Sequence, residues 1–280
     1  MNNTALDTLH ARRLGQWGQT PRARVADPEA AARLIERVGI ATLFPASPEF
    51  PNLFHAYVGD PEARTDSGHD TPSGEVYGWR WALGKRDAAF YTAIVRDRPT
   101  WVGWPLLPAV LRLRGELRPP EELYKAGELS VDALRIARAL RGAGGALNTG
   151  ELREAAGFPT GKPQRAAYLK AVAELDTRLI LAKVFSADEG DLDMRHALVA
   201  ARHPAQVAAA GRMSREEALE RVLRVYLPAA VYAVPAPLAR GLKIPERELL
   251  AALDRLVEAG AATAAPFPGQ KGTCYLWREG

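Results

Sequence analysis

The chain has 280 residues, which allows two or three domains of ordinary size, and 47% of its residues are hydrophobic, which excludes a disordered chain. Its net charge of +4 is compatible with a nucleic-acid partner but does not by itself indicate one. The single cysteine, Cys274, excludes an internal disulfide and favours a reducing compartment, so we expect a cytoplasmic protein.

The first 120 residues are expected to form a helical domain that is rich in aromatic side chains. Residues 4–16 have the composition of one helix. A second helix should begin after Asp27, whose side chain suits an N-cap, with Pro28 at the first helical position. A third is predicted over residues 75–91, and residues 118–121 (RPPE) mark a domain boundary.

Residues 130–185 have the element order of a helix-turn-helix followed by a wing. After a first helix, Asn148 with Glu151 three residues later predicts a capping box that starts a second helix. Pro163 suits the first turn of a third helix, and the β-prone residues that follow it end in a polar turn. The alternative is a plain helical bundle, but this order favours a winged-helix domain over residues 128–205.

A second unit of the same kind is predicted over residues 212–280. Ser214 with Glu217 repeats the capping box, and the order of elements recurs at a spacing of about 85 residues. Two further helices and a strand-turn-strand segment follow, at residues 235–242, 245–259 and 261–277. We therefore predict a mainly α (α+β) fold with tandem winged-helix units and small β-wings. The N-terminal domain, residues 1–120, is a candidate for a third, degenerate unit.

The third helix of the middle unit is the strongest candidate for contact with DNA. Residues 160–185 contain five basic and two acidic side chains, a net of +3. A groove-reading helix presents its N-terminal end, so basic side chains there would contact phosphates and Gln164 or Arg165 would reach base edges. The alternative is a solvated helix face. The candidate contacts are Lys162, Gln164, Arg165, Tyr168, Lys170, Arg178 and Lys183.

The last unit differs in charge. Its third helix has two basic and four acidic side chains, a net of −2, which opposes contact with phosphates. Its wing carries Gln270 and Lys271, which could still contact the DNA backbone, and Arg12 and Arg13 form another basic cluster near the N-terminus. The alternative for each is an ordinary exposed polar side chain.

Catalytic chemistry has fewer candidates. A polar loop concentrates acidic side chains and one histidine, which could bind a metal or transfer protons: Asp60, Glu62, Asp66, His69, Asp70 and Glu75. Their spacing matches no ligand pattern, so we predict neither a metal nor a cofactor. Four tryptophans, Trp79, Trp81, Trp101 and Trp104, could stack on bases, although a place in the core is the more common role.

Near its N-terminus the chain resembles the winged-helix family that includes the crosslink-unhooking alkylpurine DNA glycosylases. The resemblance lies in residues 9–19 (LHARRLGQWGQ) and 32–44 (ARLIERVGIATLF). It implies tandem winged helices and a catalytic motif of glutamine, an apolar residue, then aspartate or glutamine. The matching positions here are Thr42, Leu43 and Phe44, so neither polar residue of that motif is present.

These observations leave three functions open. We expect a tandem winged-helix protein that binds double-stranded DNA, in regulation or repair, without catalysis. A first alternative is a DNA glycosylase-like enzyme that acts on alkylated or crosslinked DNA through Asp66, Asp70 or Glu75. A second is a protein–protein module or homodimer. We expect no membrane partner, because the longest apolar stretch, residues 226–239, is interrupted by prolines and too short to span a bilayer.

Overall fold

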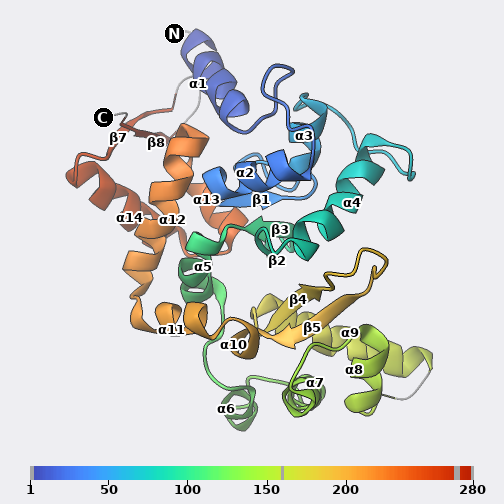
Figure 1. Ribbon diagram of the computed structural model, residues 1–280. Coiled ribbons are helices and arrows are strands. Elements are labelled where there is room, and N and C mark those ends of the chain that lie inside the picture. Colours follow the sequence, from blue (N-terminus) through green and yellow to red (C-terminus); the bar gives the residue numbers. More distant parts are fainter. Residues whose placement is uncertain (1–2, 159–160, 268–271, 279–280) are drawn as a thin grey trace.

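The computed structural model describes residues 3–158, 161–267 and 272–278, which form a mainly helical chain with small antiparallel sheets (Figure 1). Its first region contains α1 (Asn3–Gln16), α2 (Pro28–Val38), β1 (Ile40–Thr42), α3 (Leu53–Val58), α4 (Pro72–Lys85), β2 (Phe90–Val95), β3 (Arg98–Val102) and α5 (Leu107–Arg114). As predicted, the side chain of Asp27 caps α2 by accepting a hydrogen bond from the backbone N–H of Ala30 at 2.8 Å.

The middle region contains α6 (Pro120–Lys125), α7 (Val131–Ala143), α8 (Thr149–Ala155), α9 (Lys162–Thr177), β4 (Leu181–Phe185) and β5 (Met194–Leu198). The predicted capping box is present at the start of α8, with Asn148 and Glu151 each bonding the other's backbone N–H. The turn between β4 and β5, residues 186–193, lies where the sequence predicts a wing and is named the wing below.

The last region contains α10 (Val199–Arg202), α11 (Pro204–Arg212), α12 (Arg215–Ala230), β6 (Tyr232–Ala233), α13 (Pro235–Leu242), α14 (Glu246–Glu258), β7 (Ala262–Pro266) and β8 (Thr273–Trp277). The second capping box, Ser214 with Glu217, starts α12 as predicted. None of the helices in the described ranges is long and apolar enough to span a membrane.

One order of elements occurs in each region: helix, strand, two helices, then two strands. In the first region the sheet order is β1-β3-β2, and in the last it is β6-β8-β7, so the first strand pairs with the third in both. In the middle region the first strand is reduced to a bridge between Leu147 and His196 of β5. This is the order expected of a helix-turn-helix with a wing.

The sequence prediction was wrong for part of the first region. The helix predicted over residues 75–91 ends at Lys85, and Phe90 begins a strand that pairs with Val102 of β3. Asp87, between helix and strand, has a φ of +50°, which no helix continues through. The aromatic and β-branched residues of β2 suit a sheet instead.

Among the clusters of buried side chains in the described residues, two contain most of the core. The larger joins the first and last regions, and it includes Trp79 and Trp101, which are 2% and 0% exposed. These two tryptophans are therefore core residues. The smaller cluster lies inside the middle region and includes Leu134, Tyr168 and Leu175.

Candidate nucleic-acid interface

The outer face of α9 presents three basic side chains to solvent. Tyr168, Ala171 and Leu175 are buried and share one side of the helix, which packs on α7. Lys162, Arg165 and Lys170 are exposed and lie on the opposite side by helical spacing (named below as the α9 basic face). In the described part of the chain, no carboxylate forms a salt bridge with any of the three.

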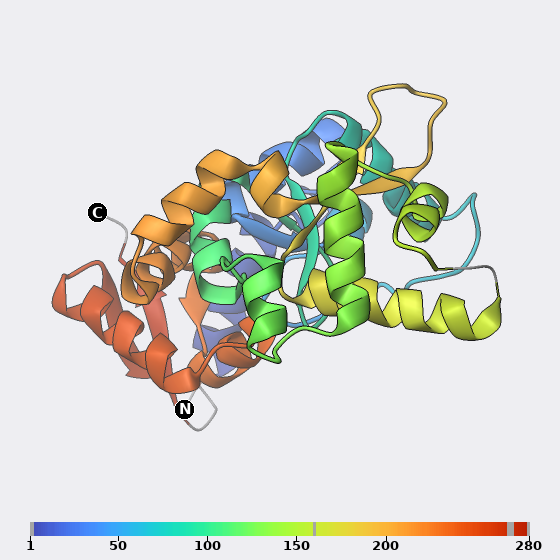
Figure 2. The ribbon, with the colours of Figure 1, turned by 90° about the horizontal axis from the view of Figure 1, so that it is seen from below.

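The position of α9 makes this face accessible. In Figure 2 the helix extends to the edge of the molecule, and its N-terminal end is outermost. Leu169 lies on the same outer side and is 51% exposed. The α9 basic face therefore combines unpaired cations with an apolar side chain, an arrangement that suits the surface of a DNA duplex.

Two residues of α9 that were predicted to contact DNA, Tyr168 and Gln164, lie on the side of the helix that faces the protein. Tyr168 is 2% exposed and packs edge-to-face on Phe158, with 5.5 Å between the ring centroids. Gln164 is half-buried and lies on the same side of the helix as Tyr168, two positions after Lys162. Tyr168 is therefore not available to DNA, and Arg165 is left as the side chain of this turn that could reach a base edge.

Arg178 and Lys183 are engaged inside the protein. Arg178 donates a hydrogen bond from Nη2 to the carbonyl of Glu128 at 2.7 Å. Lys183 pairs with Asp176, with 2.9 Å between Nζ and Oδ2, and its side chain is only 10% exposed. The predicted net charge of +3 over residues 160–185 is thus concentrated at the N-terminal part of α9, because its C-terminal cations bind within the fold.

The two arginines near the N-terminus, Arg12 and Arg13, also differ in exposure. Arg12 is exposed, but Figure 1 shows α1 and α9 at opposite ends of the molecule. Arg13 is 2% exposed: its guanidinium bonds the carbonyls of Ala230 and Tyr232 and pairs with Glu49 at 3.5 Å. The prediction that Arg13 contacts DNA is therefore wrong, because its charge is consumed between α1 and the last region.

The last region supplies little to a basic interface. Gln270 and Lys271 lie outside the described residues. On α14, Glu248 pairs with Arg215 at 2.9 Å, while Glu246, Arg247 and Glu258 are exposed. The outer surface of this helix is thus acidic, in contrast to the α9 basic face.

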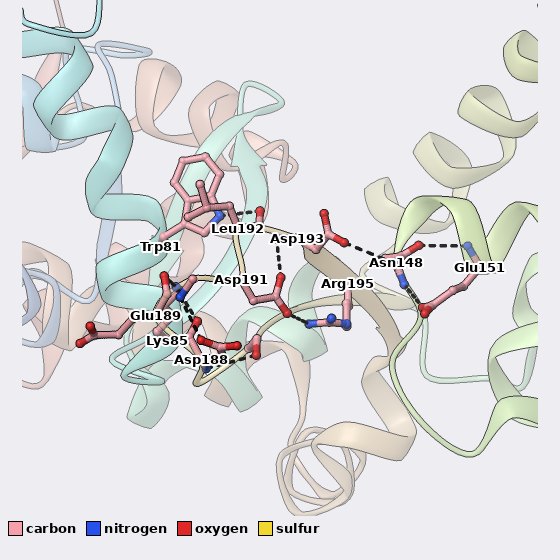
Figure 3. A network of polar contacts seen from close by, with 12 residues as sticks. Trp81, Lys85, Asn148, Glu151, Asp188, Glu189, Asp191, Leu192, Asp193 and Arg195 are labelled. Atoms are coloured by element: carbon pink, nitrogen blue, oxygen red, sulfur yellow. Dashed lines mark hydrogen bonds and ion pairs between the residues drawn. The ribbon is translucent and has the colours of Figure 1, made fainter.

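The wing of the middle region is acidic and docked. Figure 3 shows its turn, residues 186–193, lying against α4. Lys85 donates hydrogen bonds to the carbonyls of Asp188 and Glu189 at 2.8 and 2.7 Å, and Trp81 donates to the carbonyl of Leu192 at 2.9 Å. Asp191 pairs with Arg195 at 2.7 Å. This wing is therefore a strut between two regions and a poor partner for phosphate.

A glycine allows the close contact beneath the wing. At Gly84, near the end of α4, a Cβ atom would overlap the ring of Phe185, the last residue of β4. Phe185 in turn contacts the rings of Tyr91 and Trp101, at 5.9 and 6.5 Å between centroids. The absence of a side chain at residue 84 therefore lets the middle region pack directly on the first.

Of the three positions that the resemblance assigns to the catalytic motif, two are buried and one lines a pocket. Thr42 is fully buried in β1, where it pairs with Thr100 of β3, and Leu43 is 1% exposed. Phe44 alone reaches the surface, and it lines a pocket of about 870 Å³ with His55, Asp66 and Arg98 among the other lining residues.

His55 fixes one wall of this pocket. Its Nε2 lies 3.1 Å from the carbonyl of Ala63, and its Nδ1 lies 3.1 Å from the side-chain amide of Asn52. Because the amide donates, Nδ1 accepts and the proton sits on Nε2. Burial lowers the pKa of His55, which favours this neutral form. The histidine holds the loop and has no ring nitrogen left for proton transfer.

The acidic side chains of the polar loop do not converge. Glu75 accepts a hydrogen bond from Trp79 Nε1 at 2.9 Å, and Asp70 is exposed. Hydrogen bonds from Ser73 and Thr71 hold the pKa of Asp66 below its ordinary value. In the described residues, no three His, Cys, Asp or Glu side chains are placed to hold a metal ion. Of the three carboxylates considered for catalysis, Asp66 is the one that lines the pocket of Phe44.

The molecule is a mainly helical protein of repeated helix–strand units, with an exposed basic helix and a pocket at Phe44. The chain is a member of the AlkZ-related family, since the model of that family, described as AlkZ related, matches residues 25–227. It is thereby related to the crosslink-unhooking glycosylases.

A solved structure has the same fold. The Streptomyces sahachiroi DNA glycosylase AlkZ is 15% identical in sequence and superposes with a TM-score of 0.58, over 96% of this chain and 68% of that chain. A comparison with curated protein sequences finds no match.

One cluster on α4 could not be predicted as a whole, although Trp81 was one of the four tryptophans considered for stacking on bases. Tyr77, Arg80 and Trp81 form a cluster on α4 in which the Arg80 guanidinium lies 3.7 Å from the centroid of Tyr77 and 4.2 Å from that of Trp81. Tyr77 is 46% exposed. The spacing of these residues puts them on neighbouring turns of α4. The docked wing fixes the Trp81 ring through its hydrogen bond, whereas the Tyr77 ring stays exposed.

Proposed function

We propose that this protein binds double-stranded DNA through the α9 basic face and serves in DNA repair without excising a base through the motif of its family. The observation that carries the proposal is that Lys162, Arg165 and Lys170 lie on one exposed side of a helix and form no salt bridge with another described residue. Most other cations predicted to contact DNA are engaged inside the protein. Membership of a family related to DNA glycosylases supports DNA as the partner.

The division into units supports the same proposal. We propose domains over residues 1–120, 128–205 and 212–280, each built as a winged helix, with the middle one as the DNA reader. The acidic α14 and the acidic wing of the middle domain repel phosphates, so they would border the duplex without lying along it. The large buried cluster shared by the first and last regions makes these two a support for the reader.

The test is a titration of duplex DNA at two salt concentrations. Replacing Lys162, Arg165 and Lys170 with alanine should lower the slope of log K against log salt by about 3, one for each phosphate contact. A matched control is Arg212→Ala/Arg221→Ala/Arg247→Ala, which removes the same charge from exposed positions of the last region. Equal losses in both variants would mean that net charge, not α9, governs binding. Absence of binding at low salt would refute the proposal.

A second candidate, base excision, rests on one observation. Asp66 lines the pocket of Phe44, the position at which the family motif has aspartate or glutamine, and its carboxylate is ionised at neutral pH. Incubating the protein with alkylated or crosslinked duplex and measuring base release tests this candidate. Release that is lost in Asp66→Asn would establish excision and overturn the non-catalytic proposal.

A further inference from the structure

Beside the pocket of Phe44, the first turns of α4 bound a smaller hollow of about 230 Å³. Two aromatic side chains, Phe44 and Tyr77, line it, together with polar groups from Asp66, His69 and Ser73. Phe44, Asp66 and Ser73 also line the larger pocket, so the two spaces adjoin. A hollow bounded by two rings and a few polar groups suits a flat heterocyclic ligand.

The Tyr77 ring is held in place although it is exposed. Arg80 lies over it at 3.7 Å from the ring centroid, and Trp81 meets it edge-on at 5.6 Å. Trp81 is itself fixed by its hydrogen bond to the carbonyl of Leu192 in the docked wing (Figure 3). A ligand that stacks on Tyr77 therefore loses little side-chain entropy, because the ring is already ordered.

The loop that lines the hollow packs closely on α4. A Cβ atom at Gly74 would overlap the carbonyl oxygens of Gly68 and His69, so the loop backbone lies directly against the first turn of the helix. Thr71 caps that turn by accepting a hydrogen bond from the N–H of Gly74 at 3.1 Å. The hollow is thus bounded by closely packed loop backbone, by the first turns of α4 and by the rings of Phe44 and Tyr77.

The charge of the hollow decides what can enter. Asp66 lines it as an ionised carboxylate, and Asp60, Glu62 and Asp70 outnumber Arg64 on the same exposed loop. A phosphate group would meet like charges, whereas the N–H edge of a nucleobase would donate to the carboxylate. The ligand that fits is a flat, uncharged ring with N–H donors.

We propose that the hollow between Phe44 and Tyr77 binds one unstacked nucleobase of a DNA substrate, stacked on Tyr77 with an N–H edge toward Asp66. This inference rests on the proposed DNA binding and adds a preference for DNA that contains a displaced or unpaired base. Stacking of a base on an aromatic side chain is sequence-tolerant, so the preference concerns the state of the base more than its identity.

The experiment compares a fully paired duplex with the same duplex carrying one unpaired 2-aminopurine, a fluorescent purine with an exocyclic amino group. The wild-type protein should bind the second duplex roughly tenfold more tightly or better, in line with loss of one base–aromatic stack, and should quench its fluorescence. Tyr77→Ala should abolish both effects without changing affinity for the paired duplex, and Tyr77→Phe should retain them.

A matched control is Tyr124→Ala, since Tyr124 is a tyrosine of similar exposure, 44%, on α6 and far from the hollow (Figure 1). It should behave as the wild type. Equal affinity of the wild type for the two duplexes, or a preference that survives Tyr77→Ala, would overturn the inference while leaving the proposed DNA binding in place. Failure to bind either duplex would overturn both.

Discussion

Two regions of the molecule use basic side chains in opposite ways. On the α9 basic face, Lys162, Arg165 and Lys170 are exposed and form no salt bridge with the described residues. Where α1 meets the last region, Arg13 is buried between two carbonyls, a carboxylate and the rings of Trp17 and Tyr232. The difference shows that a basic side chain contributes to a nucleic-acid surface only where it is not already bound to acceptors of the protein itself.

The third helices of the middle and last regions extend this contrast. Both occupy the same place in the order of elements, yet α9 presents cations outward and α14 presents mainly carboxylates. Shared architecture therefore does not imply a shared surface. The experiments below test whether engaged and unengaged cations differ as strongly in their effects as they do in their environments.

The largest effect should come from Arg13. Replacing it with methionine leaves Glu49, whose side chain is 6% exposed, as a buried carboxylate without its cation, although Tyr226 still donates to it at 2.9 Å. Removing one partner of a buried pair costs about 3–5 kcal/mol, so the free energy of unfolding in urea should fall by that amount.

Arg22 provides a matched control for this variant, because it is a nearby arginine and is exposed. Arg22→Met should change the free energy of unfolding by less than about 0.5 kcal/mol. If the two variants proved equally stable, Arg13 would have to be regarded as another surface cation. Adding Glu49→Leu to Arg13→Met should recover part of the lost stability, because it removes the uncompensated charge.

A somewhat smaller effect is expected for charge reversal on α9. Replacing Lys162, Arg165 and Lys170 with glutamate places repulsion where attraction is proposed, and duplex affinity at low salt should fall by about 100-fold or more. The stability of the protein should change little, because all three side chains are exposed.

Variants of α14 provide the control for this experiment. Glu246→Gln/Glu258→Gln removes two exposed negative charges from α14 and should alter duplex affinity by less than about threefold, through the general field of the protein alone. If duplex affinity rose in this variant as much as it is expected to fall in the α9 variant, DNA would have to lie along both helices. Anisotropy titrations with one fluorescent duplex serve for all variants.

Local signals in the sequence predicted much of this fold. The capping boxes at Asn148 and Ser214 and the cap at Asp27 are formed as expected, because each depends on side chains within three residues of the backbone groups that they satisfy. The strands β2 and β3 were missed, since their pairing is decided by partners in the fold and not by a local pattern.

The candidate site was predicted only in part, for the same physical reason. Lys162, Arg165 and Lys170 could be identified from helical spacing and charge. The burial of Arg13 could not, because its acceptors at Ala230 and Tyr232 are 217 and 219 residues away in sequence. Tyr77 was likewise hidden, since its ordered and exposed ring depends on a wing that docks from another region.

The stability of the protein should depend on pH through His196, which lies beside the engaged cation Lys183. His196 is 6% exposed and faces Lys183 across the β4–β5 pair. Burial, with a smaller contribution from Lys183, lowers its pKa from 6.5 to about 3. The unfolded chain therefore binds a proton below pH 6.5 that the folded chain does not. Stability is fully present above pH 6.5 and should fall by about 2 kcal/mol between pH 7 and pH 5.

The measurement compares urea unfolding of the wild type and His196→Gln at the two pH values. The variant lacks the titrating group, so its loss of stability between pH 7 and pH 5 should be smaller than that of the wild type by about 2 kcal/mol. Contributions from the other histidines are common to both proteins and cancel. Parallel losses in the two proteins would show that His196 can accept a proton without unfolding.

The smallest effect tests the contrast between cations most directly, with one lysine of each kind. Lys85 is engaged by the carbonyls of Asp188 and Glu189, and Lys170 lies on the α9 basic face. Lys85→Met and Lys170→Met change the net charge equally. Lys170→Met should lower the salt slope of duplex binding by about 1, whereas Lys85→Met should leave it unchanged and cost about 1 kcal/mol of stability or less.

The engaged lysine should also produce a local signature. Without its two hydrogen bonds the wing is held to α4 mainly by Trp81, so hydrogen exchange of residues 186–193 should accelerate in Lys85→Met and not in Lys170→Met. If Lys85→Met reduced the salt slope as much as Lys170→Met, Lys85 of α4 would have to contact phosphate when DNA binds. Hydrogen exchange of residues 186–193 with DNA bound would then show whether the ammonium group leaves the two carbonyls or contacts phosphate with its third N–H.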